Sequence, residues 1–102
     1  MEFYMYDMRD YLITQHLSAR SNQAIFKFDN GYGASVIQGL YTYGGNEGLF
    51  EVAVLRFIND DDYEICYDTP ITEDVLGYLS ENEVMESLRD IRNLSVSQLP
   101  TK

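Results

Sequence analysis

The pattern of apolar and polar residues becomes regular at residue 23, where apolar side chains begin to fall at alternate positions. This period of two predicts a β-strand over residues 23–29, and similar stretches follow at 33–39, 49–58 and 63–68. The stretch 49–58 is apolar on both of its faces, which is typical of a central, well-buried strand. We therefore predict an antiparallel sheet of about four strands.

Near the C-terminus a helical period replaces this alternation. Ser80 and Glu83 have the three-residue spacing of a capping box, which predicts a helix from Glu81 to Asn93. Arg89 and Arg92 lie at its end, where the helix dipole favours cations. An apolar stripe on one side of the helix is expected to pack on the sheet, and it consists of Val84, Leu88 and Ile91.

Two segments allow less definite expectations. The first seventeen residues have apolar side chains at helical spacing, so we expect a helix there, although 3–6 could equally be a strand. Thr72-Glu73-Asp74 has the polar acceptor and early acids of a helix start leading into 75–79, and the glycine-rich segment 41–48 predicts a loop.

Together these elements predict the α+β class, with a sheet of about four strands packed against a C-terminal helix and a candidate N-terminal helix. The length of 102 residues fits one domain with a single small core. Within it, 1–20 form an N-terminal extension and 94–102 a flexible tail.

The stretch Asp29-Asn30-Gly31-Tyr32-Gly33 raises the question of a phosphate-binding loop. Such a loop needs backbone amides ahead of a helix and, in its common form, a lysine followed by serine or threonine. Here a strand-like run follows and no lysine is near. Because Asn and Gly supply the positive φ that hairpins require, the sequence predicts a turn.

Other candidates for chemistry are equally weak. Asn59-Asp60-Asp61-Asp62 with Glu64 has alternating acids like a calcium loop but lacks the mid-loop glycine, so a solvated turn is favoured. His16 is the single histidine and Cys66 the single cysteine. The sequence therefore indicates neither a zinc site nor a catalytic cysteine-histidine pair with a conventional supporting group. We expect no catalytic residues, metal or cofactor, and hence not an enzyme.

Charge is the strongest signal in the composition. Seventeen acidic and seven basic residues give a formal net charge of −10. Residues 59–102 hold eleven of the acids and three of the bases, so most of the charge belongs to the C-terminal half. This distribution opposes direct binding to nucleic acid or anionic lipid, and it favours either a solubilising surface or an acidic face for a basic partner.

Nine tyrosines and no tryptophan form a second signal. Tyr32, Tyr41 and Tyr43 surround the glycine-rich loop, where they either form an interface or cover the sheet. The N-terminus lacks the pattern of a secretory signal and no segment has the length and apolarity of a membrane span, so we expect a cytoplasmic protein.

The chain from Phe26 to Leu94 resembles a family of small acidic proteins encoded by bacteriophages and prophages. The resemblance is carried by 28–37, by Tyr43-Gly44-Gly45 with 48–55, and by 66–72 with 75–79. It implies a phage context and the cytoplasm of the host cell, and it implies no catalytic residues.

These observations lead to two hypotheses. The first is a non-catalytic phage accessory protein that binds a basic host protein, such as an anti-CRISPR or anti-restriction inhibitor that imitates DNA. The second is a small structural or self-associating protein that uses the tyrosine/glycine loop or a sheet edge to form a homo-oligomer. The candidate partner-binding residues are Asp60, Asp61, Asp62, Glu73, Asp74, Glu83, Glu86, Asp90, Tyr41 and Tyr43.

Overall fold

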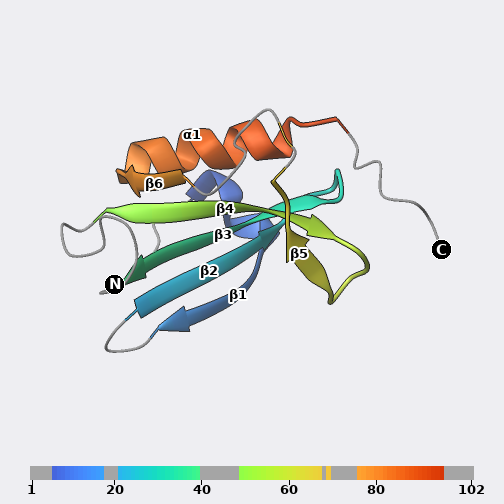
Figure 1. Ribbon diagram of the computed structural model, residues 1–102, viewed down its shortest axis with the longest axis horizontal. Coiled ribbons are helices and arrows are strands. Elements are labelled where there is room, and N and C mark those ends of the chain that lie inside the picture. Colours follow the sequence, from blue (N-terminus) through green and yellow to red (C-terminus); the bar gives the residue numbers. More distant parts are fainter. Residues whose placement is uncertain (1–5, 18–20, 40–48, 68, 70–75, 96–102) are drawn as a thin grey trace.

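Strands dominate the described part of the chain and lie in one antiparallel sheet, with one α-helix toward the C-terminal end of that part (Figure 1). The structure is a computed structural model that describes residues 6–17, 21–39, 49–67, 69 and 76–95. The elements are η1 (Tyr6–Tyr11), β1 (Leu12–Leu17), β2 (Ser21–Lys27), β3 (Tyr32–Gly39), β4 (Phe50–Phe57), β5 (Tyr63–Ile65), β6 (Leu76–Leu79) and α1 (Glu81–Arg92).

The strands follow one another along the sheet in chain order, β1-β2-β3-β4-β5. β4 pairs with β3 along one of its edges, so its other edge is shared by β5, opposite Leu55 to Phe57, and β6, opposite Phe50 to Val52. Every pairing is antiparallel. Within the described residues, β1 and β5 are therefore edge strands along most of their length.

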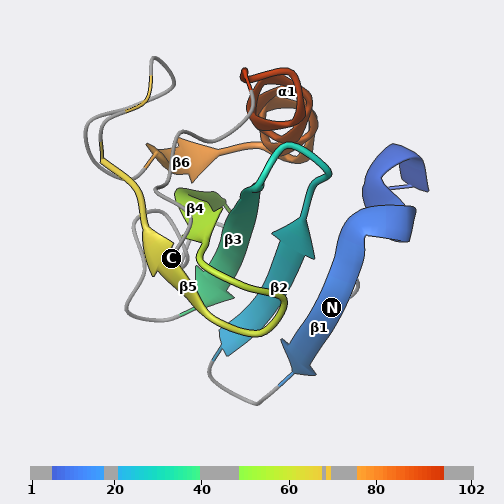
Figure 2. The ribbon, with the colours of Figure 1, turned by 90° about the vertical axis from the view of Figure 1, so that its right-hand side faces the viewer.

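The main core lies between one face of the sheet and α1, with η1 on the same side (Figure 2). Alternate residues of the three central strands point toward the helix, as the pleat requires. They meet the apolar stripe of α1, which is fully buried as the sequence predicts. The buried residues of this core include Met8, Ala24, Phe26, Ala34, Val36, Val52, Val54, Val84, Leu88 and Ile91.

The opposite face of the sheet, which we call the far face, carries a smaller buried cluster. Ile25, Leu55 and Phe57 form this cluster at neighbouring positions of β2 and β4. Gly33 of β3 lies between them, and a Cβ atom there would collide with the backbone of Phe26 and the ring of Phe57. The absence of a side chain at Gly33 thus leaves room for the Phe57 ring to pack close to the backbone of β3.

The predicted α+β class, the central strand and the C-terminal helix are confirmed, although the sheet has more strands than expected. The expected N-terminal helix is wrong beyond residue 11, because 6–11 form a 3-10 helix and 12–17 form β1. Met8 accounts for part of the helical spacing, since its side chain is buried within η1. From Leu12 onward, hydrogen bonding to β2 outweighs the weak helical pattern.

The segment after residue 75 also differs from the expectation. The helix start expected at 72–74 lies outside the described residues, and Leu76–Leu79 form strand β6 against β4. Tyr78 has a φ of 58°, a left-handed conformation that is costly for a side chain of this size. Pairing with the open edge of β4 thus places this segment in a strand whose backbone is irregular at Tyr78.

The turn between β2 and β3 also fixes the end of α1. Asn30 is buried there, and its side-chain amide donates to the carbonyl oxygens of Ile91, Arg92 and Leu94 at 2.9, 3.0 and 3.0 Å. Its side-chain oxygen accepts from the Tyr32 backbone N–H at 3.0 Å, and Gly31 supplies the positive φ of 86°. One side chain thus shapes the predicted hairpin turn and satisfies carbonyls that a helix end leaves without partners.

We expect Asn30→Ala to lower the free energy of unfolding by about 2–3 kcal/mol, because buried carbonyls of α1 lose their donor. Asn30→Asp should cost at least as much, since a carboxylate cannot donate and its charge opposes the negative end of the helix dipole. Urea unfolding followed by circular dichroism measures both. The adjacent exposed Asp29→Ala is the control, with an expected change within about 0.5 kcal/mol.

Candidate functional site

The predicted acids of the C-terminal helix lie on the outer side of α1, away from the sheet. Glu83, Glu86 and Asp90 are all exposed. Glu83 also belongs to the capping box, in which its carboxylate accepts from the Ser80 backbone N–H at 3.0 Å and the Ser80 hydroxyl accepts from the Glu83 N–H at 3.3 Å. The hydrogen bonds that Ser80 donates to the Glu83 carboxylate, chiefly from its backbone N–H and then from its hydroxyl, hold the pKa of Glu83 below its ordinary value.

A second group of predicted acids lies in the turn between β4 and β5. Asp60, Asp61 and Asp62 are exposed there, and Asn59 organises the turn. The Asn59 side-chain oxygen accepts from the backbone N–H groups of Asp61 and Asp62 at 2.9 and 2.8 Å, while its amide donates to the Asp62 carboxylate at 2.9 Å. We call residues 59–67, which comprise this turn, β5 and the two residues after it, the acidic hairpin.

Lys27 attaches the acidic hairpin to the far face of the sheet. Its ammonium group lies 2.8 Å from the Asp60 carboxylate and 5.3 Å from the centre of the Phe57 ring. The hydrogen bond and the positive charge of Lys27 hold the pKa of Asp60 below its ordinary value. The resulting stabilisation is present above pH 3.8 and is lost as the pH falls through the lowered pKa.

The two acidic groups do not form one continuous surface. In both ribbon views the sheet separates α1 from the turn between β4 and β5 (Figures 1 and 2). Of the ten predicted partner-binding residues, the structure thus places three on the helix and three on the acidic hairpin. The remaining four, Glu73, Asp74, Tyr41 and Tyr43, lie outside the described residues.

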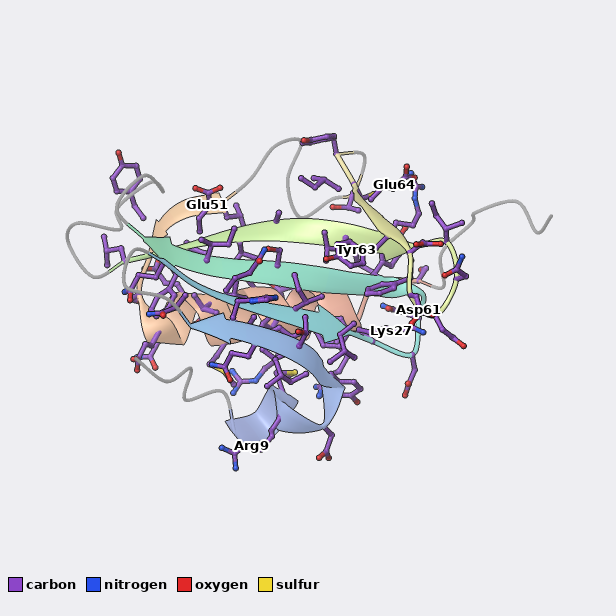
Figure 3. All side chains as sticks on the ribbon, turned by 90° about the horizontal axis from the view of Figure 1, so that it is seen from below. Arg9, Lys27, Glu51, Asp61, Tyr63 and Glu64 are labelled. Carbon is purple, nitrogen blue, oxygen red and sulfur yellow. The ribbon has the colours of Figure 1, made fainter. Side chains whose placement is uncertain are left out.

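Apolar side chains in the acidic hairpin were not among the predicted site residues. Tyr63 and Ile65 remain 42% and 46% exposed, and Tyr67, just after β5, is also exposed. Tyr63 lies on the far face beside the Phe57 ring, with ring centres 5.2 Å apart (Figure 3). The alternation of Tyr63, Ile65 and Tyr67 with Glu64 and Cys66 shows that these three share a side, but not that this side meets solvent.

The described residues that could carry chemistry are dispersed. His16 is exposed on β1, whereas Cys66 is buried in the main core. In the Asp29-Asn30-Gly31 stretch, the Asn30 side chain donates hydrogen bonds to the carbonyl groups at the end of α1. Among the described residues, no three His, Cys, Asp or Glu side chains are grouped so that they could hold a metal ion.

Comparisons with known proteins add no identification. No protein-family model, curated protein or solved structure matches the chain. In the described part of the chain, none of the helices has the length and apolarity needed to cross a bilayer.

The attachment of the acidic hairpin can be tested through the pKa of Asp60. Lys27→Met should raise this pKa toward its ordinary value of 3.8, because the donor and the positive charge are removed together. Carboxyl carbon NMR titration measures the pKa of each side chain separately. Glu83 is the internal control, since its lowered pKa depends on Ser80 and should not change in the variant. An unchanged Asp60 pKa would contradict the contact with Lys27.

Proposed function

We propose that this chain is a non-catalytic phage accessory protein that binds a basic surface of a host protein in the host cytoplasm. The most specific form of this proposal is an inhibitor of a nucleic-acid-binding defence enzyme, whose basic channel would otherwise hold phosphates. The resemblance of Phe26–Leu94 to small acidic phage proteins supports the phage context. The net charge of −10 favours a partner with a basic surface.

The observation that carries this proposal is the composition of the acidic hairpin. Protein interfaces combine an apolar centre, often aromatic, with a polar rim. The acidic hairpin has both, because the exposed Tyr63 follows directly after three exposed aspartates and the exposed Ile65 lies two residues further along. Its turn is already ordered by Asn59 and Lys27, so little conformational entropy would be lost when a partner binds.

The exposed acids Glu83, Glu86 and Asp90, which we call the outer row of α1, form a second acidic surface for the same class of partner. At about 1.5 Å of rise per residue, the carboxylates of Glu83, Glu86 and Asp90 recur about every 5 Å along the helix axis, compared with about 3.4 Å per phosphate along a DNA strand. Arg89 and Arg92 offset part of this charge. The described outer row contains no exposed large apolar side chain, so we favour the acidic hairpin as the main contact.

Self-association is the second candidate function, and the composition of β1 favours it. This edge strand, Leu12–Leu17, contains no Asp, Glu, Lys or Arg, and Ile13 is 49% exposed. Strand edges without charges are prone to pair with other chains. A structural role through β1 would produce an oligomer whose stability depends little on salt.

The proposal is tested by affinity capture of the tagged protein from a lysate of the bacterium that its phage infects, at low and high salt. We expect a basic nucleic-acid-binding protein to be retained at low salt and released at high salt, because screening weakens contacts between exposed charges. Duplex DNA added to the purified pair should displace the chain. Recovery of the chain alone, independent of salt, would support self-association instead.

Two matched double variants then locate the contact on the captured partner. Asp61→Asn with Glu64→Gln removes two negative charges from the acidic hairpin, and Glu86→Gln with Asp90→Asn removes two from the outer side of α1. We expect the first pair to weaken binding by roughly tenfold and the second by less than about threefold. If neither pair weakens binding, the acidic side chains are not the contact and the proposal fails.

A further inference from the structure

The outer edge of β5 has backbone groups that point away from the sheet. The Ile58 N–H donates to the Asp62 carbonyl at 2.9 Å, and the Cys66 N–H donates to the Val54 carbonyl at 2.7 Å. In an antiparallel ladder, hydrogen-bonded and non-hydrogen-bonded pairs alternate. Tyr63 and Ile65 face Phe57 and Leu55 in the non-hydrogen-bonded pairs, so their own N–H and C=O groups point outward.

No described strand pairs with this outer edge, because β5 ends the strand order of the sheet. The side chains of Tyr63 and Ile65 flank the edge on the far face, and both are nearly half exposed. On the other side of the strand, Glu64 is exposed and lies 3.7 Å from Arg56. The edge thus presents backbone donors and acceptors between an apolar side and an acidic side.

We propose that β5 is a docking edge for an extended basic segment of a partner protein, which adds to the sheet as a further strand. Backbone hydrogen bonds to Tyr63 and Ile65 would give affinity, as in other cases of strand addition. The side chains of the added strand alternate between the two faces of the sheet. Apolar residues would lie beside Tyr63 and Ile65, and lysine or arginine residues would lie beside Glu64.

Charge selects this occupant over a second copy of the chain. The acids at 60, 61, 62 and 64 surround the edge. Lys27 pairs with Asp60 and Arg56 with Glu64, so these two bases offset only part of the negative charge. Pairing of two β5 strands would bring two such groups together in chains that each carry −10. A basic segment gains attraction where a second copy meets repulsion.

The docking edge rests on the proposed function in one respect, namely that the partner is basic. It is tested with the intact protein and a synthetic heptapeptide of alternating lysine and valine, Lys-Val-Lys-Val-Lys-Val-Lys. A peptide with glutamate in place of lysine tests the charge requirement, and a peptide of identical composition with three adjacent valines tests the alternation. Backbone amide NMR shifts locate the contact, and their saturation gives the dissociation constant.

We expect saturable shifts at residues 62–67 with the alternating lysine peptide, and weaker binding of both other peptides. Ile65→Gln should weaken binding by roughly tenfold, because much of its exposed apolar surface would be covered in the complex. Ile13→Gln on β1 is the matched control, since that isoleucine is exposed to nearly the same extent on the opposite edge of the sheet. This control variant should bind the peptide as the unmodified protein does.

Each other outcome overturns the docking edge in a distinguishable way. Shifts confined to Glu81, Glu86 and Asp90 would leave a basic partner in place but move its contact to α1. Loss of binding in Ile13→Gln alone would assign strand addition to β1. Shifts at 62–67 that grow with protein concentration in the absence of peptide would identify a second copy as the occupant, and no saturable shift at any residue would remove the docking edge altogether.

Discussion

The hydrogen bonds of Asn30 determine how the helix lies on the sheet. The turn between β2 and β3 and the end of α1 are 61 to 64 residues apart in the chain, yet one buried side-chain amide joins them through three carbonyls. At its other end the helix begins at the capping box of Ser80, directly after β6, which pairs with β4. With both ends fixed, the apolar stripe of α1 lies along the sheet and its acids face outward. The main core thus lies between the sheet and α1, and the acidic hairpin contacts the far face of the sheet through Lys27 and Phe57.

The acidic hairpin depends on a second set of contacts that is independent of the helix. The missing side chain at Gly33 makes room for the Phe57 ring, and this ring in turn lies beside Tyr63 and beneath the ammonium group of Lys27. Lys27 also binds Asp60, while Asn59 orders the backbone of the turn. These contacts help to hold β5 against β4, although the strand has only three residues. They leave its outer edge available, which is the basis of the interaction that we propose.

Much of the fold could be predicted from the sequence, because the patterns that determine it are local. The capping box, the apolar stripe of α1 and the alternation in β2, β3 and β4 each follow from a few neighbouring residues. β1 and β6 could not be predicted in this way, since their extended conformation depends on edges provided by β2 and β4. The role of Asn30 was hidden for the same reason, because a turn residue and a residue that caps a distant helix look alike in sequence. For the candidate site, the exposed acids were evident from charge, whereas the exposure of Tyr63 and Ile65 depends on β5 being an edge.

The openness of that edge is the central claim, and amide hydrogen exchange of the free protein tests it most directly. At a concentration where the protein is monomeric, the Cys66 amide should be protected, since it donates to Val54 within the sheet. The amides of Tyr63 and Ile65 should exchange at rates close to those of an unstructured peptide, because they point to solvent. Strong protection of Tyr63 and Ile65 in the monomer would mean that another part of the chain already covers this edge, and it would contradict the account.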